Sequence, residues 1–324
     1  MRHESARRLL RLGDVMTRLI LEDLPGPVLE TINWRCGELL NISQYLPASP
    51  DSSALLARLE FDDGSRAVLK AGIKGIDAGE LLRRETWART HRTDIPGPEV
   101  RLIGTIDQAH LLVTSYVNDM YHAPSLVPGT RDLELVVEGL AELSLRFTAT
   151  SMPSGAARAE DDLRQEVSSA IKVLSPGVLP VDELDVWQAA LRLFDDAAVA
   201  GTTLLHRQWV PRHLLVAVGY PIVVTDWSRT AYGAAWVDLV PFGVHLVQAG
   251  HPEGEVEELF ARSFPCWRQA PYGAVTGYIA TWALHQMLVA SRTPRPQDAP
   301  LQPGPTPPLR LAAFAWVQHR LRSS

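Results

Sequence analysis

The chain has 324 residues, of which 46% are hydrophobic and 21% are charged, and its formal net charge is −6. This length suits one large two-lobed domain or two modest domains, and the composition is that of a folded globular protein. The acidic balance argues against nucleic acid as a partner, because nucleic-acid-binding proteins usually carry a basic patch. Two distant cysteines, Cys36 and Cys266, indicate neither a disulfide scaffold nor a Cys/His metal site.

Two segments bear on the location of the protein. The N-terminal stretch 1–26 is charged throughout and lacks the unbroken apolar core of a secretory signal. The late run "YGAVTGYIATWALHQMLVAS", residues 272–291, contains Thr, His and Gln and fits a buried helix better than a membrane span. We therefore expect a soluble, cytoplasmic protein with no membrane partner. Its wealth of Ala, Arg, Leu and Pro is typical of a bacterial genome rich in G and C.

The first third of the chain predicts strands with one helix among them. Apolar spacing predicts an N-terminal helix over 5–22, which "LPGP" breaks. The segments "ALLARLEF" and "SRAVLKAG" read as two strands joined by a tight turn at "DDG". After a helix over 77–92, the stretch "VRLIGTIDQAHLLVTSYV" predicts a second pair of strands around "DQA".

From about residue 130 the pattern becomes helical, with a short two-stranded stretch at 204–227. Segregated strands and helices indicate an α+β protein of two unequal lobes. We expect three parts: an N-terminal lobe over 1–117 (a helix, an antiparallel sheet and one further helix), a mainly helical lobe over 118–292, and a Pro-rich connector with a last helix over 293–324.

The stretch "LLHRQWVPRHLLVAVGYPIVVTDW", residues 204–227, has the layout of a kinase active site. It reads as a strand end, a polar loop, a short strand, a turn and a second strand that ends on Asp226. Phosphoryl transfer needs a cation on the phosphates, an acid that orients this cation, metal ligands and a proton acceptor. Lys70 at the end of "SRAVLK" and Glu85 on the following helix match the strand Lys and helix Glu of kinases.

These segments together resemble the aminoglycoside phosphotransferase and choline kinase superfamily, which shares the protein-kinase fold. Its members typically read "HGDLHPGNLLV…VIDW…AWDLA", and this chain reads "HRQWVPRHLLV…VVTDW…AWVDLV". The resemblance covers roughly residues 40–290 in layout and is specific between 204 and 240. It implies a two-lobed protein-kinase-like fold, with ATP and Mg²⁺ as possible cofactors.

The resemblance also implies roles for individual residues of the nucleotide site. Lys70 would contact the α- and β-phosphates, with Glu85 as its partner. The segment "TSYV", which contains Ser115 and Tyr116, would connect the lobes and meet the adenine through backbone groups. Ser52 and Ser53 could donate to phosphate; they lie in the stretch "QYLPASPDSSALL", which corresponds to the turn between the first two strands of the family. That loop lacks the usual glycine and has two prolines, so it is stiffer and offers fewer N–H donors.

In the helical lobe, the resemblance places a metal ligand and a loop around it. Asp226 would bind Mg²⁺, and Asp238 would brace the catalytic loop. His206 lies in the catalytic segment, and a hydrogen-bonded packing role is favoured for it over catalysis, because no nucleophile or metal ligand lies near it in sequence.

Three positions in the loop depart from the family pattern. Gln208 stands where the family has its catalytic Asp, and a neutral amide does not accept a proton at neutral pH. His213 stands at the metal-binding Asn, although Mg²⁺ prefers oxygen to imidazole nitrogen. Arg207 replaces a Gly, and with Arg212 it puts two guanidinium groups beside the loop. These could bind phosphate or pair with local carboxylates.

The sequence leaves open whether the protein is an enzyme. The favoured hypothesis is a pseudokinase that acts through a ligand or a protein partner. The Pro-rich segment and the acidic helix "AEDDLRQE" could bind that partner, or could simply be solvated. The alternative is an active ATP-dependent phosphotransferase on a hydroxyl of a small molecule or peptide, with Gln208 orienting the hydroxyl and Asp226 holding the metal. A third possibility is a protein that sequesters a small molecule, as an immunity protein does.

Overall fold

The computed structural model describes residues 21, 24–45, 55–75, 77–148, 152–174, 179–292 and 306–323. The chain divides at Val117 into two compact units, which we call the strand unit (1–117) and the helical unit (118–324). The predicted α+β class is confirmed. Three predicted features lie wholly or almost wholly outside the described residues. They are the N-terminal helix over 5–22, both serines of the phosphate-loop prediction (Ser52 and Ser53), and residues 293–305 of the Pro-rich connector.

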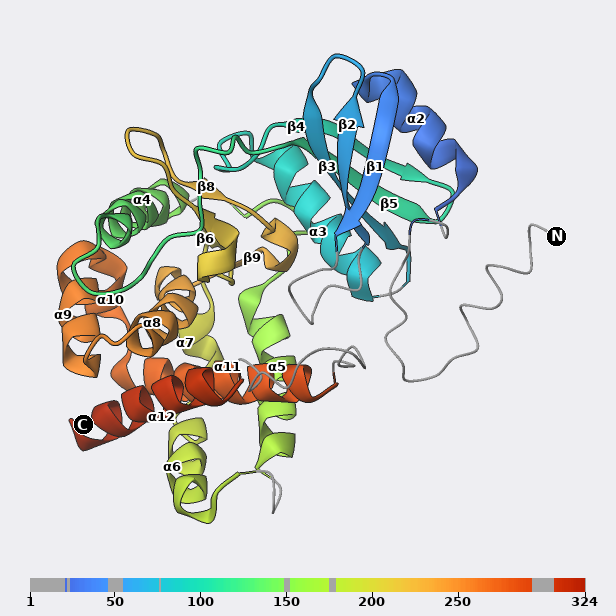
Figure 1. The fold of residues 1–324 in the computed structure, drawn as a ribbon. Coiled ribbons are helices and arrows are strands. Elements are labelled where there is room, and N and C mark those ends of the chain that lie inside the picture. The colour runs from blue at the N-terminus through green and yellow to red at the C-terminus, as the bar shows by residue number, and fades with distance from the viewer. Residues whose placement is uncertain are drawn as a thin grey trace. The chain divides into compact units, whose positions relative to one another are not determined.

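One five-stranded antiparallel sheet, in the order β1-β2-β3-β5-β4, forms the strand unit (Figure 1). Its strands are β1 Leu39–Tyr45, β2 Leu55–Phe61, β3 Arg66–Ile73, β4 Val100–Ile106 and β5 Ala109–Ser115. The two strand pairs predicted around "DDG" and "DQA" are confirmed as β2–β3 and β4–β5. Gly64 at the first turn has φ 77°, a value that glycine adopts without a steric cost.

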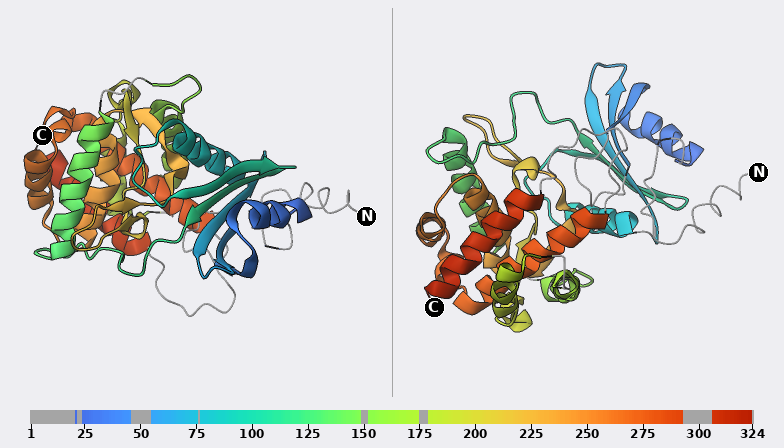
Figure 2. Two further views of the ribbon diagram at one scale, coloured as in Figure 1. Left: turned by 90° about the horizontal axis from the view of Figure 1, so that it is seen from above. Right: turned by 60° about the horizontal axis from the view of Figure 1, so that its bottom comes forward.

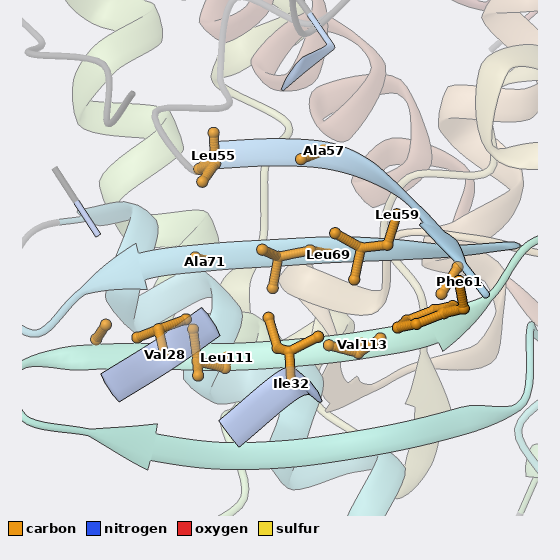
Figure 3. Close-up of a cluster of buried hydrophobic side chains, with 12 residues drawn as sticks. Val28, Ile32, Leu55, Ala57, Leu59, Phe61, Leu69, Ala71, Leu111 and Val113 are labelled. Carbon is orange, nitrogen blue, oxygen red and sulfur yellow. The ribbon is translucent and has the colours of Figure 1, made fainter. Parts of the chain in front are cut away.

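Alternating apolar residues cover one face of this sheet. Because side chains along a strand point to opposite faces in turn, every second residue of β2, β3 and β5 contributes to one apolar layer. Helix α2 (Gly26–Cys36) packs on this layer, and Figure 3 shows Val28 and Ile32 directed toward Leu111 and Val113 of β5. The sheet is thereby fixed from one side by a helix that begins at Gly26 and carries Pro27 in its first turn.

The opposite face of β3 carries the functional side chain. Lys70 lies between Leu69 and Ala71 of the buried layer and therefore points the other way, to the face where helix α3 (Asp77–His91) packs against β3 and β5. The start of α3 approaches the end of β3 so closely that a Cβ at Gly79 would lie 2.0 Å from the carbonyl oxygen of Ile73. This close approach fixes α3 over the end of β3.

The helical unit is built around helix α11 (Tyr272–Arg292). Helices α5, α6, α8 and α12 pack against it, and Figure 2 shows α12 lying beside α11. The other helices of this unit are α4 Arg131–Phe147, α5 Ala159–Val173, α6 Val181–Leu191, α7 Asp196–Val199, α8 Leu239–Gln248, α9 Glu253–Ser263, α10 Pro265–Gln269 and α12 Thr306–Arg322. None of the helices in the described residues is long and apolar enough to span a bilayer.

Two short strand pairs hold the kinase-like segment in the helical unit. Strand β6 (Thr203–Leu205) pairs with β9 (Ala231–Gly233), and β7 (Leu214–Leu215) pairs with β8 (Val223–Val224). Three single turns of 3₁₀ helix join them, at Pro211–His213, Trp227–Arg229 and Ala235–Asp238. Residues 206–213, which we call the loop 206–213, thus leave one pair and enter the other.

Candidate active site

In the strand unit, Lys70 and Glu85 form an ion pair. The Lys70 Nζ atom donates to Glu85 Oε2 at 2.8 Å, and the Glu85 side chain is almost fully buried while that of Lys70 is 21% exposed. A buried carboxylate next to an ammonium fixes both the position and the charge of the lysine. The Lys70–Glu85 pairing predicted from the sequence is therefore present.

The structure limits what Ser115 and Tyr116 can offer to a nucleotide. The N–H of Ser115 donates to the Glu99 carbonyl at 2.8 Å, and the N–H of Tyr116 donates to the Arg66 carbonyl at 3.0 Å. The Arg66 guanidinium lies 4.4 Å from the centre of the Tyr116 ring. Both N–H groups are thus used inside the strand unit, so an adenine would have to meet the carbonyl groups here or the backbone of Val117.

In the helical unit, Asp238 braces the backbone of the loop 206–213. Its carboxylate accepts the N–H of His206 at 2.7 Å and the N–H of Arg207 at 2.5 Å. Burial raises the pKa of Asp238 to about 7, against the two backbone hydrogen bonds, which favour the ionised form. The bracing role inferred from the resemblance agrees with this geometry.

His206 is enclosed in the same loop, and both of its ring nitrogens contact backbone groups. Nδ1 accepts the N–H of Gln208 at 3.2 Å, so the proton is on Nε2, which donates to the Thr225 carbonyl at 2.9 Å. The ring also meets Trp227 edge to face, with 4.8 Å between ring centres. A histidine held this way orients the loop, and the geometry favours this packing role over the catalytic one.

Arg207 is directed inward and does not face a ligand. It is 3% exposed and has φ 65°, a left-handed conformation that suits the Gly of the family pattern better than Arg. Its guanidinium donates to Asp162 at 2.6 Å and to Glu166 at 2.7 Å, both on α5. Of the two alternatives for Arg207, the pairing with local carboxylates is correct. Burial tends to lower the pKa of Arg207, but the nearby negative charges, above all that of Glu166, raise it above its usual value.

Gln208, which the resemblance places at the position of the family's catalytic Asp, lies in this braced loop. It is 7% exposed, and its backbone is fixed by the bond from its N–H to His206. Among the described residues its amide side chain makes no hydrogen bond. An amide can orient a hydroxyl but cannot take its proton at neutral pH.

Asp226 and His213 come together at the end of the loop. Asp226 is in the left-handed region with φ 62°, and its side chain is 30% exposed. Its Oδ2 atom lies 3.5 Å from Nε2 of His213, which is buried. The exposed Arg212 donates from Nε to the same nitrogen at 3.1 Å.

These donors do not fit a magnesium ion. Mg²⁺ takes an octahedral set of oxygen ligands, and here one of the two donors is an imidazole nitrogen with an arginine beside it. Within the described residues, no three His, Cys, Asp or Glu side chains come together as a possible metal cluster. Asp226 alone suits Mg²⁺, and the pair of Asp226 with His213 does not.

A separate cavity of about 350 Å³ lies in the helical unit, among α9, α10, α11 and α12. Its central carboxylate, Glu257, already accepts from Trp267 at 3.0 Å, from Trp316 at 2.8 Å and from Arg320. Its residues include none of those predicted from the sequence, and its charged core is paired internally. The cavity therefore contributes nothing to the candidate active site.

Sequence reasoning missed the two carboxylates that hold Arg207. The acidic helix "AEDDLRQE" was expected either to bind a partner or to be solvated, and for Glu166 both expectations are wrong, since it is 5% exposed. A signal was present in the spacing. Glu166 follows Leu163 and precedes Ala170 on the buried stripe of α5, where a charged residue needs a buried partner.

A strand unit with a paired lysine and a helical unit with a braced loop next to an Asp define a protein-kinase-like fold. Comparison with known families agrees: the Phosphotransferase enzyme family (APH) matches residues 52–272. This match covers more than half of the chain, and the chain belongs to that family. The superfamily resemblance seen in the sequence is confirmed. A search of curated proteins found no significant match.

Solved structures share this fold across nearly the whole chain. Choline kinase LicA from Streptococcus pneumoniae is 12% identical, with a TM-score of 0.61 over 92% of this chain and 98% of that one. Aminoglycoside phosphotransferase APH(4)-Ia is 14% identical, with a TM-score of 0.59 over 92% and 98%. Macrolide 2'-phosphotransferase type I is 18% identical, with a TM-score of 0.56 over 93% and 98%. The predicted two-lobed fold is thereby confirmed.

Proposed function

We propose that this phosphotransferase-family protein is a pseudokinase: it binds a nucleotide, transfers phosphate poorly, and acts through a bound small molecule or a protein partner. One observation carries the proposal. Gln208, whose amide accepts no proton, stands in the loop position of the catalytic Asp while the backbone around it is braced by Asp238. The loop is therefore well formed, and only its chemistry is altered.

The size of the expected loss follows from the role of the proton acceptor. General-base catalysis contributes typically about 10²–10⁴-fold to a rate. Gln208 is buried and uncharged, and the Arg207 side chain is directed inward. Neither residue can therefore replace the proton acceptor. A residual rate from positioning alone is expected to be slow.

Retention of the nucleotide rests on the strand unit. Lys70 keeps its charge and position through Glu85, and an ammonium on the phosphates is the main cation that a kinase-like protein supplies. The related APH(4)-Ia has been solved with ADP and hygromycin B, and LicA with AMP. We extend nucleotide binding from those proteins to this chain as part of the proposal.

The ligand class follows from the same relatives. Their names indicate choline, an aminoglycoside and a macrolide, and we propose a small hydroxyl-bearing molecule or a peptide as the ligand of this chain. A cytoplasmic location and a bacterial source remain predictions from the sequence.

A second function, an active transferase with altered machinery, is favoured by a specific observation. The loop backbone is intact, and the partly exposed Asp226 lies beside His213 at its end. In that case the Gln208 amide orients the substrate hydroxyl, as a glutamine orients water in some GTPases, without taking its proton.

Calorimetric titration with ATP, together with measurement of ATP turnover, tests the proposal. We expect binding that Lys70→Met weakens and Lys70→Arg, which keeps the charge, weakens less. Turnover should stay near background with choline, hygromycin B or a macrolide present. Rapid turnover with any of them would establish the second function. Absence of ATP binding, with tight binding of one of these molecules, would point instead to a sequestering protein.

A further inference from the structure

The two arginines of the loop 206–213 have different surroundings. Arg207 is 3% exposed, and its guanidinium is enclosed by two carboxylates of α5. Arg212 is exposed, and its Nε–H donates to Nε2 of the buried His213 at 3.1 Å. The loop therefore directs one guanidinium group into the protein and presents the other to solvent, held by a buried side chain.

The same histidine nitrogen also lies next to Asp226. Oδ2 of Asp226 is 3.5 Å from Nε2 of His213, so a carboxylate and the Arg212 guanidinium approach one atom. The N–H of Thr225 donates to the His213 carbonyl at 2.8 Å, and the Thr225 hydroxyl donates to the same oxygen at 3.3 Å. These backbone contacts fix the turn that carries Arg212 against the segment that carries Asp226.

The charge of Arg212 makes this position unfavourable for a divalent cation. A guanidinium near Asp226 offsets the negative charge that would attract such an ion, and it also repels the ion directly. Its charge extends to α8 as well: burial lowers the pKa of His245 to about 4, and the positive charge of Arg212 adds to this effect. The chain itself thus supplies the positive charge at the end of the loop.

Guanidinium chemistry indicates which anion this position takes. The group is planar, stays charged at physiological pH and donates two parallel N–H bonds to a pair of oxygen atoms. A phosphate chain offers several such pairs and more than one negative charge, which matters at an exposed site where water weakens each ion pair. Arg212 stays exposed while His213 holds its Nε–H, so a polyphosphate fits it best.

We propose that Arg212 is the cationic group that binds phosphate oxygens in the helical unit, in place of the divalent ion that the family resemblance implies. Phosphate binding by this chain therefore requires no divalent metal. That the phosphate belongs to a nucleotide rests on the proposed function, whereas the anion site at Arg212 does not.

Calorimetric titration with ATP, once in EDTA and once in excess Mg²⁺, tests this inference. For the wild type we expect the two dissociation constants to agree within about 3-fold. Arg212→Gln should weaken binding in EDTA by about 10-fold, the loss expected for one hydrogen bond from a charged donor. Mg²⁺ should then strengthen ATP binding to this variant, because Asp226 has lost the neighbouring cation.

Arg262→Gln is the matched control. It removes the same charge from an exposed arginine of α9, and we expect it to bind ATP as the wild type does. Inorganic pyrophosphate, titrated in EDTA, tests the anion site without the adenosine part. We expect Arg212→Gln to weaken pyrophosphate binding and Arg262→Gln to leave it unchanged.

The outcomes separate this inference from the proposed function. ATP binding that requires Mg²⁺, or equal binding of ATP in EDTA by the wild type and Arg212→Gln, would overturn the inference and leave the nucleotide in place. Pyrophosphate binding that depends on Arg212, without any binding of ATP, supports the anion site and removes the nucleotide from the proposed function. If neither ATP nor pyrophosphate binds in EDTA, the inference is wrong.

Discussion

The Lys70–Glu85 pair in the strand unit and the loop 206–213 in the helical unit are held in a similar way, but they differ in the side chains that they present. In each, a buried carboxylate holds a functional group: Glu85 holds the Lys70 ammonium, and Asp238 holds the backbone of the loop. In the strand unit the side chain that is presented matches the family pattern. In the helical unit the bracing Asp matches the family pattern, whereas the side chains of Gln208 and His213 do not match it. The framework of a site can therefore persist while its chemistry changes.

Physical chemistry explains why the braces persist more readily than the reactive groups. Removing one partner from a buried charge pair leaves an uncompensated charge and costs several kcal/mol. Replacing the Gln208 side chain leaves the hydrogen bond from its backbone N–H to His206 in place. Glu85 and Asp238 are therefore needed for stability, whereas the catalytic Asp of a family member is needed only for activity. The following variants test this contrast.

The largest effect is expected for Arg207→Ala. The substitution leaves Asp162 and Glu166 without their buried cation, and we expect a loss of about 4 kcal/mol in unfolding free energy. Arg207→Gly should lose about 1 kcal/mol less, because glycine adopts φ 65° without strain. Urea denaturation of both variants measures the two losses in unfolding free energy. A variant as stable as the wild type would show that the buried cluster stabilises nothing.

Among the substitutions, Lys70→Met should have the next largest effect. It leaves the buried Glu85 carboxylate without the Lys70 ammonium, and we expect the strand unit to lose about 3 kcal/mol. In the double variant Lys70→Met/Glu85→Leu most of this loss should be recovered, since an apolar pair replaces a buried ion pair at little cost. Hydrogen exchange of strand-unit peptides follows the stability, and ATP titration follows binding. Recovery of stability together with ATP binding would contradict the role of Lys70.

The pH dependence of stability should report the Asp238 brace. Because burial raises the pKa of Asp238 to about 7, the folded protein binds this proton more tightly than the unfolded chain, whose Asp has a pKa of about 3.9. The stabilisation from this proton is therefore complete below about pH 4 and is lost as the pH rises through about 7. Since one pKa unit corresponds to about 1.4 kcal/mol, we expect a fall of about 4 kcal/mol over that window.

Asp238→Asn is the control for this experiment, because it removes the titrating group and keeps the shape. The difference in unfolding free energy between wild type and Asp238→Asn, measured from pH 5 upward, isolates the contribution of Asp238. If that difference stays constant with pH, the two backbone hydrogen bonds outweigh burial and the carboxylate is ionised throughout.

The sequence predicted the elements whose signal is local. The hairpins β2–β3 and β4–β5 followed from alternating residues around short polar turns, and α4 and α5 from their apolar spacing. Helix α2 was missed because "LPGP" was interpreted only as the end of a helix. Pro27 also fits the first turn of a helix, since a proline there lacks only an N–H that has no helical partner.

Contacts between distant segments could not be predicted in the same way. The pairing of Lys70 with Glu85 was found because the family pattern supplies it. The pairing of Arg207 with Asp162 and Glu166 joins residues more than 40 positions apart and has no such pattern. Their charges indicated a possible partner, but only the fold of α5 against the loop shows that the partner lies within the chain.

The smallest effect is expected for Gln208→Asp, and it addresses the contrast most directly. The substitution restores a proton acceptor in a loop whose backbone is already braced. We expect ATP turnover with Mg²⁺ to rise less than about 10-fold, well short of the 10²–10⁴-fold typical of a general base. The reason is that His213 and Arg212 remain at the metal position.

Single-turnover phosphate release measures the change in ATP turnover. Gln208→Asn is the matched control, because Asn has the size of Asp but accepts no proton. The double variant Gln208→Asp/His213→Asn should then exceed the product of the two single effects, because base and metal ligand act in one step. A full gain from Gln208→Asp alone would show that the proton acceptor was the only missing part. The helical unit would then differ from the strand unit at one side chain, and His213 would be no obstacle to Mg²⁺.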